Sequence, residues 1–254
     1  MRDVDGVRLY VENAAGMWPC RGPEFHCPLP VPEGALLHRV PRVGNVRGLL
    51  TRRVRAAVPE LVEPAVVRRG AYTLEDPFGD LEWEGPVPDR VAEYPVMVLR
   101  PGTGGHAADG APAPGGERRS GIRVAPIAGP ADLAEAERVI AEGFPIPAVL
   151  PLLPGGFLPH RILADPAAGV LLARSAGRAA AACVTYDSGA AVGVYWLATL
   201  PAYRSRGLGR AVMNAVRAAH PGRVLTLVAT PDGAPLYASM GFAEVSRSCW
   251  RFWS

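Results

Sequence analysis

The spacing of apolar residues predicts three helices in the second half of the chain. The clearest covers residues 207–219, where apolar side chains recur every three or four positions and a His-Pro-Gly sequence follows. A second helix is expected to begin at Pro130, which suits a first helical turn, and to end before Pro145. A short third helix, residues 235–240, precedes Gly241, a residue type common just after helix ends.

Runs of apolar residues separated by glycine-containing turns predict strands around these helices. Three successive runs, which indicate a hairpin meander, cover residues 170–174, 179–186 and 191–200. Four more strands are expected at residues 94–100, 123–127, 224–228 and 245–253. The second half of the chain is therefore predicted to contain both strands and helices.

A segment rich in glycine and proline divides the chain near its middle. Residues 101–120 read PGTGGHAADGAPAPGGERRS and contain almost no large apolar residue, so they are expected to be a flexible linker. The full length of 254 residues suits one large domain or two small ones. We therefore predict a smaller N-terminal α/β domain at residues 1–100, a linker at 101–121 and a second domain at 122–254.

Charge is distributed unevenly between the two predicted domains. Residues 1–100 contain 13 arginines against 14 acidic residues, a net charge of −1, whereas residues 121–254 contain 12 against 8, a net charge of +4. The positive excess suits an anionic ligand of the second domain. No basic stripe is interleaved with aromatic residues, so nucleic acid is not expected as a partner.

Three absences in the sequence limit the class of protein. No run of about 18 apolar residues predicts a membrane span, so no membrane partner is expected. The polar start, Met1–Asp5, lacks the apolar run of a secretory signal, so we expect a cytoplasmic protein. Cys20, His26 and Cys27 lack a fourth ligand and the usual short spacing of a zinc site, so no metal is expected.

A loop rich in glycine and arginine lies before the clearest helix. Residues 200–210 read LPAYRSRGLGR, in which Gly207 and Gly209 allow the backbone to approach a ligand closely. The helix start offers N–H groups without intrahelical partners and the positive end of its dipole, which together suit a pyrophosphate. Positive charge for phosphates comes from Arg204, Arg206 and Arg210. The spacing lacks the lysine of a Walker loop and the third glycine of GxGxxG.

A second motif follows the predicted strand at residues 224–228. Residues 236–242 read LYASMGF. Arg204-x-x-Gly207-x-Gly209 and this Leu-Tyr-x-x-x-Gly-Phe, in that order, resemble two motifs of the GNAT superfamily of N-acetyltransferases, over about residues 122–254. The resemblance implies an α/β (α+β) fold with a mixed, mostly antiparallel sheet flanked by helices. Some members carry a degenerate N-terminal copy, so residues 1–100, which lack the glycine loop, are a candidate for one.

The resemblance implies acetyl-CoA as co-substrate and gives each matching residue an expected role. Backbone amides are expected to bind the pyrophosphate at Arg206, Gly207, Leu208, Gly209 and Arg210, with Arg204 supporting the loop. Pantetheine is expected along the strand edge formed by Ala198, Thr199 and Leu200. Thr230 stands where members often have an asparagine, and its hydroxyl is expected to hydrogen-bond to the cofactor. Tyr237 is the expected general acid for the departing thiolate; the alternative is a core tyrosine packed beside Phe242.

The general base and the acceptor stay open. Many members place a glutamate on the strand before the loop, but here that strand reads VYWL over residues 194–197. The remaining candidates are Glu142, His160, Asp187 or a water chain. We expect transfer of acetyl to the primary amine of a small molecule or peptide, and keep a non-catalytic acyl-CoA sensor or scaffold as the alternative. Homodimerisation is left open.

Overall fold

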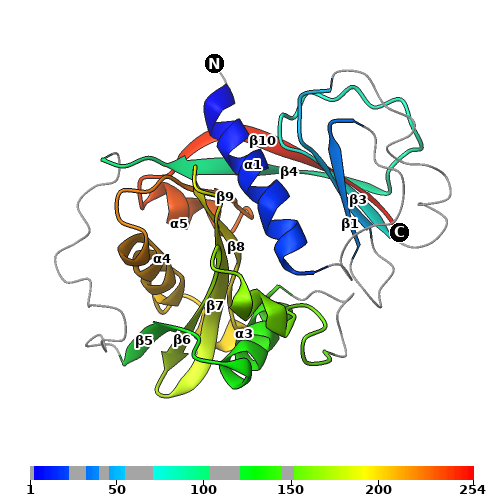
Figure 1. The fold of residues 1–254 in the computed structure, drawn as a ribbon. Helices are drawn as coiled ribbons and strands as arrows, with labels where there is room; N and C mark the ends of the chain where they lie inside the picture. The colour runs from blue at the N-terminus through cyan, green and yellow to red at the C-terminus, as the bar shows by residue number, and fades with distance from the viewer. Residues whose placement is uncertain (1–2, 23–32, 40–45, 55–70, 103–120, 145–151) are drawn as a thin grey trace.

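The computed structural model describes residues 3–22, 33–39, 46–54, 71–102, 121–144 and 152–254 (Figure 1). The strands are β1 (Ala35–Arg39), β2 (Val46–Leu50), β3 (Tyr72–Asp76), β4 (Arg90–Leu99), β5 (Ile122–Pro126), β6 (Ala168–Ser175), β7 (Arg178–Asp187), β8 (Val192–Thr199), β9 (Leu225–Val228) and β10 (Ala243–Trp253). The helices are α1 (Val4–Cys20), α3 (Pro130–Gly143), α4 (Leu208–Ala219) and α5 (Ala234–Ala238), with 3-10 turns η4 (His160–Ala164) and η5 (Pro201–Tyr203). Most of the predicted linker lies outside the described residues.

The described strands join one sheet in the order β1-β2-β3-β10-β4-β9-β8-β7-β6-β5. β5 to β8 form an antiparallel meander, and β10 is antiparallel to both of its neighbours. Parallel pairs occur between β2 and β3 and between β8 and β9. The prediction of a mixed, mostly antiparallel sheet flanked by helices is confirmed, and the predicted meander corresponds to β6, β7 and β8.

β4 comes from the first part of the chain but lies inside the sheet of the second part. Residues 96–99 of β4 pair with β9, and residues 90–98 pair with β10 along the other edge. The last five residues of β4 are buried, which fits an apolar strand with both of its faces covered. The strands that follow residue 121 therefore form a continuous sheet only with β4 in place. The division at 1–100, 101–121 and 122–254 stays a prediction.

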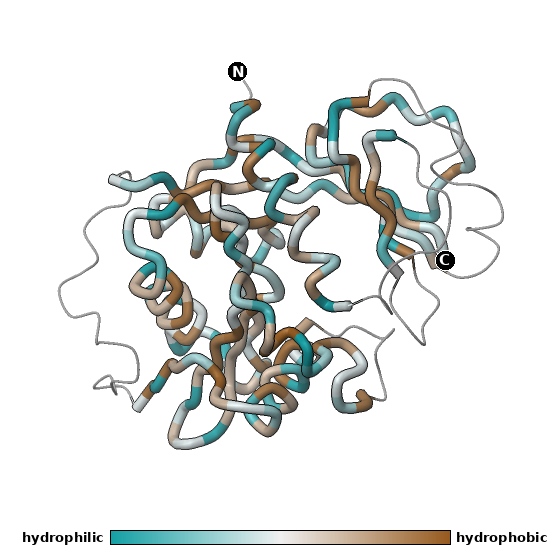
Figure 2. Tube along the Cα trace, in the orientation of Figure 1, coloured by the Kyte–Doolittle hydropathy of each residue, from teal (hydrophilic) through white to brown (hydrophobic). Residues whose placement is uncertain are grey.

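Helices cover both faces of this sheet (Figure 1). α4 and α5 share one core with Met97 and Leu99 of β4. α1 packs on the opposite face, in a core with Val96 and Val98 of the same strand, and α3 packs on that face of β7 and β8. Figure 2 shows apolar and polar segments alternating along α4, as an amphipathic helix requires. Two layers of helices thus enclose the central strands.

Two features are absent from the described residues, a membrane-spanning helix and a group of metal ligands. None of the helices within the described ranges is long and apolar enough to cross a membrane. No group of three His, Cys, Asp or Glu side chains gathers there in a way that would hold a metal ion. His26 and Cys27, whose spacing with Cys20 does not suit a zinc site, lie outside the described residues.

Candidate active site

The sheet opens between β8 and β9. These parallel strands pair only at Val192 with Leu225 and at Gly193 with Thr226. β8 continues to Thr199 without further pairing to β9 among the described residues, while β9 pairs with β4 on its other edge. The backbone groups along this edge of β8 are therefore available to a ligand that enters the gap between the two strands.

β8 contains a β-bulge beside this gap. Cys183 of β7 opposes two residues of β8, Trp196 and Leu197, because the register shifts between Ala182 and Val184. Trp196 has a φ of 49°, a left-handed conformation that bulky side chains rarely adopt. A bulge changes the direction in which the following backbone groups point. The N–H groups after Trp196 can therefore face either β7 or the gap.

The bulge turns two backbone N–H groups toward the gap. The Val192 N–H donates to the carbonyl of Val224, the residue before β9, at 2.9 Å, whereas the Leu200 N–H donates to the Ala180 carbonyl of β7 at 2.9 Å. Residues eight apart in a regular strand would face the same edge, so the bulge has reversed the alternation. The N–H groups of Leu197 and Thr199 therefore face the gap, and those of Ala198 and Leu200 face β7.

The loop after β8 forms a helix start without a side-chain cap. Ser205 and Gly207 both have positive φ values, 61° and 82°. Gly207 is the residue before α4, and it makes no side-chain cap because it has no side chain. The N–H groups of the first turn, from Leu208 to Arg210, thus have no intrahelical acceptor and lie at the positive end of the helix dipole. This geometry suits an anion such as a pyrophosphate.

Gly209 has a packing role in addition to its expected role in ligand binding. A Cβ at this position would lie 3.2 Å from the Leu236 side chain and 3.6 Å from that of Leu197. The missing side chain therefore lets α4 approach both α5 and β8. Gly207 differs, because a Cβ there would meet no atom within 4 Å and only its positive φ favours glycine.

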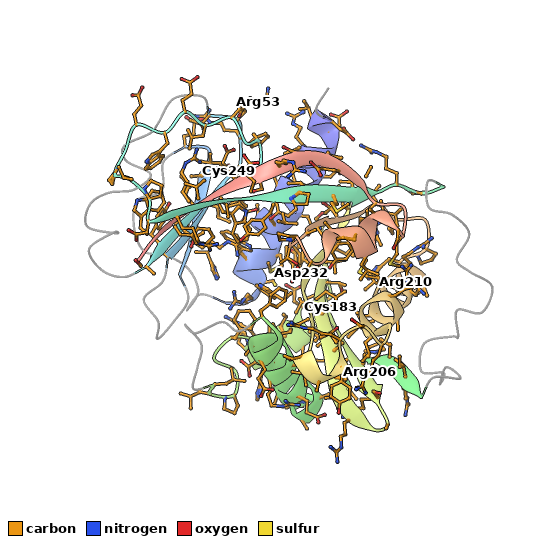
Figure 3. The ribbon with its side chains drawn as sticks, turned by 180° about the vertical axis from the view of Figure 1, so that it is seen from behind. Arg53, Cys183, Arg206, Arg210, Asp232 and Cys249 are labelled. Carbon is orange, nitrogen blue, oxygen red and sulfur yellow. The ribbon has the colours of Figure 1, made fainter. Side chains whose placement is uncertain are left out.

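The three arginines of the loop make different contacts. Arg204 donates from Nη2 to the Gly143 carbonyl at 2.9 Å and from Nε to the Thr199 carbonyl at 3.3 Å, so it joins the ends of α3 and β8. Arg206 lies over the Tyr203 ring at 5.6 Å. Arg210 donates to Ser239 Oγ at 2.7 Å. Figure 3 shows Arg206 and Arg210 on the α4 side of the sheet. Arg204 is thus a structural residue of the loop, and the other two are closer to the helix start.

Tyr237 lies in the core on the side of the sheet that α4 covers. Tyr237 is 7% exposed, and its ring packs edge-to-face against the Phe242 ring, with the two ring centres 5.7 Å apart. Burial raises the pKa of Tyr237 above its ordinary value, and the nearby Cys183 adds to the rise. No hydrogen bond of its hydroxyl occurs among the described residues. The ring packing foreseen as the alternative is therefore present, and the role of the hydroxyl stays a prediction.

Thr230 uses its hydroxyl locally. Its Oγ1 accepts a hydrogen bond from the Gly233 N–H at 3.2 Å, and its carbonyl accepts from the Ala234 N–H at 2.9 Å. These bonds shape the turn that leads into α5. The hydroxyl hydrogen of Thr230 is still free to donate to a ligand, because an accepted hydrogen bond does not use it.

The three side-chain candidates for the general base lie in different places. Asp187 accepts two hydrogen bonds from Arg223, at 2.6 and 2.8 Å, next to the end of the gap where β8 and β9 still pair. Glu142 is exposed on α3 and accepts from Arg138 at 2.9 Å. His160 is exposed on η4. The structure does not gather these groups around one point.

A polar contact on the opposite face of β8 was missed by sequence reasoning. The Tyr195 hydroxyl donates to Asn13 Oδ1 of α1 at 2.6 Å. Asn13 is fully buried, and its Nδ2 donates to the carbonyls of Ala191 at 2.8 Å and Tyr186 at 2.9 Å. An asparagine on the apolar face of an N-terminal helix was a usable signal, because buried polar side chains need partners. α1 is thereby fixed to the start of β8.

Residues 166–244 match the family model of the acetyltransferase (GNAT) domain. No curated protein matches the chain. A GCN5-related N-acetyltransferase from Kribbella flavida has a similar structure, with 14% identity, a TM-score of 0.58 and coverage of 95% of this chain and 93% of that one.

Two further solved structures share the fold over most of the chain. A tandem GNAT protein from the clavulanic acid biosynthesis pathway is 15% identical, with a TM-score of 0.53 and coverage of 98% of this chain and 95% of that one. A GCN5-related N-acetyltransferase-like protein from Streptococcus suis is 11% identical, with a TM-score of 0.52 and coverage of 86% and 84%. At these identities the similarity concerns the fold alone. The matched segment contains β8, the glycine loop, α4 and Tyr237, and residues 166–244 of this chain therefore form an acetyltransferase domain of the GNAT superfamily.

Proposed function

We propose that this protein is an acyl-CoA-dependent N-acyltransferase that transfers acetyl from acetyl-CoA to a primary amine of a small molecule or peptide. The observation that carries the proposal is the gap between β8 and β9, which lies beside the uncapped start of α4. A thioester in this gap and a pyrophosphate at the helix start would both meet unused backbone N–H groups. Acetyl is the default donor group because the matched family is one of acetyltransferases.

The residues present fit acetyl-CoA at three points. The amides from Arg206 to Arg210 suit the pyrophosphate, and the side chains of Arg206 and Arg210 add positive charge near it. The edge of β8 suits the pantetheine arm, because Leu197 and Thr199 face the gap. Thr230 has a hydroxyl hydrogen to donate. Arg204 supports the loop through its contacts with Gly143 and Thr199.

The chain's own groups account for most of the transfer step. The nitrogen of a neutral amine attacks the thioester carbonyl, and the developing oxyanion accepts a hydrogen bond from the Leu197 N–H. The C–S bond then breaks, and Tyr237 gives its proton to the departing thiolate. The proton that the amine loses passes to a water chain, the remaining candidate, since Asp187 and Glu142 are engaged with arginines and His160 is exposed on η4.

The alternative is a non-catalytic acyl-CoA sensor or scaffold. Two observations favour it: residues 194–197 carry no carboxylate, and the Tyr237 ring packs in the core. Binding of acetyl-CoA does not separate the two functions, because both require it. Turnover does.

The deciding experiment is thiol release from acetyl-CoA in the presence of a panel of primary amines. The panel includes amino acids, polyamines, arylalkylamines and short peptides with free N-termini. An acyltransferase releases thiol at a rate that depends on the identity and concentration of one class of amine. Tight binding of acetyl-CoA with no amine-dependent release would instead support the sensor.

A further inference from the structure

The bulge in β8 is contacted by a residue from the far N-terminal part of the chain. Arg21, which follows α1, is 2% exposed, and its guanidinium carbon lies 4.9 Å from the Phe157 ring centre and 5.0 Å from the Trp196 ring centre. The two rings meet edge-to-face with centres 4.8 Å apart. Arg21 Nη2 also donates to the Phe157 carbonyl at 2.7 Å. We refer to Arg21, Phe157 and Trp196 as the Arg21 cluster.

The Arg21 cluster is fixed from two other elements. Glu137 of α3 is 1% exposed and accepts hydrogen bonds from the Phe157 N–H at 2.6 Å and from two neighbouring backbone N–H groups. His38 of β1 places Nε2 3.1 Å from Arg21 Nη1. A guanidinium only donates, so this ring nitrogen accepts. Residues of α3 and β1 thus hold Phe157 and Arg21, which both contact the Trp196 indole.

Trp196 needs such support because of its backbone conformation. Its φ of 49° is unfavourable for a bulky residue and persists only where the surroundings fix it. The peptide unit after Trp196 carries the Leu197 N–H, which faces the gap between β8 and β9. Any relaxation of Trp196 toward a regular strand would restore the normal alternation and turn this N–H toward β7.

We propose that Arg21 is a positioning residue for acyl transfer: it holds Trp196 so that the Leu197 N–H points at the thioester carbonyl. This inference rests on the proposed function. A hydrogen-bond donor stabilises an oxyanion only when it is already aimed at the place where the charge develops. Arg21 does not touch the thioester; it acts through the Trp196 ring, as a contribution of the first part of the chain to the site on the second.

The test observes the thioester carbonyl itself. Infrared difference spectra of carbonyl-labelled [¹³C]acetyl-CoA are recorded in complex with the wild type, Arg21→Met and Arg21→Lys, with Arg8→Met as an exposed control on α1. A hydrogen bond from Leu197 lowers the stretching frequency of the bound carbonyl relative to free acetyl-CoA. Arg21→Met is expected to return it toward the free value and to lower kcat roughly tenfold, with acetyl-CoA affinity unchanged.

The other variants sharpen the result. Arg21→Lys keeps a cation beside the rings but loses the planar fork, so an intermediate frequency is expected. Arg8→Met should match the wild type. If Arg21→Met does not fold, Arg21→Lys carries the test, because a wild-type carbonyl frequency without the planar fork would show that Arg21 does not hold Trp196.

Three results would overturn the inference. A folded Arg21→Met protein with the wild-type carbonyl frequency and kcat would show that Trp196 holds its conformation unaided. A parallel loss of acetyl-CoA affinity and kcat would show a binding role in place of a positioning role. A wild type that binds no acetyl-CoA would contradict the proposed function itself, which distinguishes that failure from the first two.

Discussion

Tyr237 combines a packed ring with a hydroxyl whose role one substitution isolates. Tyr237→Phe keeps the edge-to-face contact with Phe242 and removes only the oxygen. We expect kcat to fall by roughly 10²-fold, because the thiolate loses its acid, while acetyl-CoA affinity changes by less than about twofold. Burial raises the pKa of Tyr237 above its ordinary 10.0, so the phenol holds its proton at neutral pH. Thiol release at saturating substrate measures kcat, and an unchanged value would leave Tyr237 as a core residue only.

Arg206 allows a test of the loop that leaves the core intact. Its side chain is exposed and lies over Tyr203, so Arg206→Ala removes charge without opening a cavity. We expect acetyl-CoA binding to weaken by about 1–2 kcal/mol with an unchanged melting temperature, since one charge-assisted contact is lost among several backbone contacts. Arg217→Ala, in the last turn of the same helix, is the matched control and should bind normally. Equal weakening in both variants would point to general charge and against a site at the helix start.

At the scale of elements, the Asp187–Arg223 pair joins the end of β7 to the residues just before β9. Burial raises the pKa of Asp187, but the Gly189 N–H and the Arg223 guanidinium outweigh it, so the pKa lies below its ordinary 3.8. A lowered folded-state pKa means that the stabilisation is present above the unfolded value and is lost as the pH falls through the folded one. We therefore expect Asp187→Asn to cost about 1 kcal/mol of unfolding free energy at neutral pH and progressively less below pH ~3.8.

Urea unfolding at pH 7 and at pH 3 checks this prediction. Glu84 is an exposed carboxylate, so Glu84→Gln serves as the control and should leave the unfolding free energy unchanged at both pH values. The same difference between Asp187→Asn and the wild type at both pH values would contradict the ion-pair explanation. The Asp187→Asn protein should also keep its kcat near neutrality, because an ion-paired carboxylate is a weak base.

Helices and strands of the second half were predictable because their signals are local. The repeat of apolar residues in α4 and the glycine turns between β6, β7 and β8 are properties of short segments, and the structure has these elements close to the predicted bounds. The glycine loop and the Leu-Tyr-x-x-x-Gly-Phe motif were also recognisable. The bulge at Trp196 was not, since a tryptophan inside an apolar run reads as an ordinary strand residue. Its conformation depends on Arg21 and Phe157, which are distant in sequence.

At the scale of the whole molecule, β4 makes the two parts of the chain interdependent. Without it, both β9 and β10 lose a partner along an apolar edge. We expect residues 122–254 alone to be insoluble or unfolded, and co-expression with residues 1–102 to restore a folded complex. Circular dichroism and size-exclusion chromatography measure both. A folded, acetyl-CoA-binding fragment of residues 122–254 would contradict this dependence and support the division into separate domains.

The position of β4 in the sheet could not be predicted from the sequence patterns. Residues 94–100 were recognisable as a strand, but strand pairing between residues more than a hundred positions apart leaves no local signal. Their apolar run is consistent with any buried strand. The glycine- and proline-rich segment that follows predicts a boundary between domains, and the described strands before and after it belong to one sheet, so the division itself stays a prediction.

The central structural claim is that acetyl-CoA binds along the edge of β8 and at the start of α4. Amide hydrogen exchange with and without acetyl-CoA tests this claim most directly, because it reports which backbone groups the ligand covers. We expect slower exchange at residues 197–199 and 205–210 on addition of acetyl-CoA, with exchange in β1 and β2 unchanged. These are the edge of β8 that faces the gap and the turn that leads into α4. No protection at saturating acetyl-CoA, or protection confined to other elements, would contradict it.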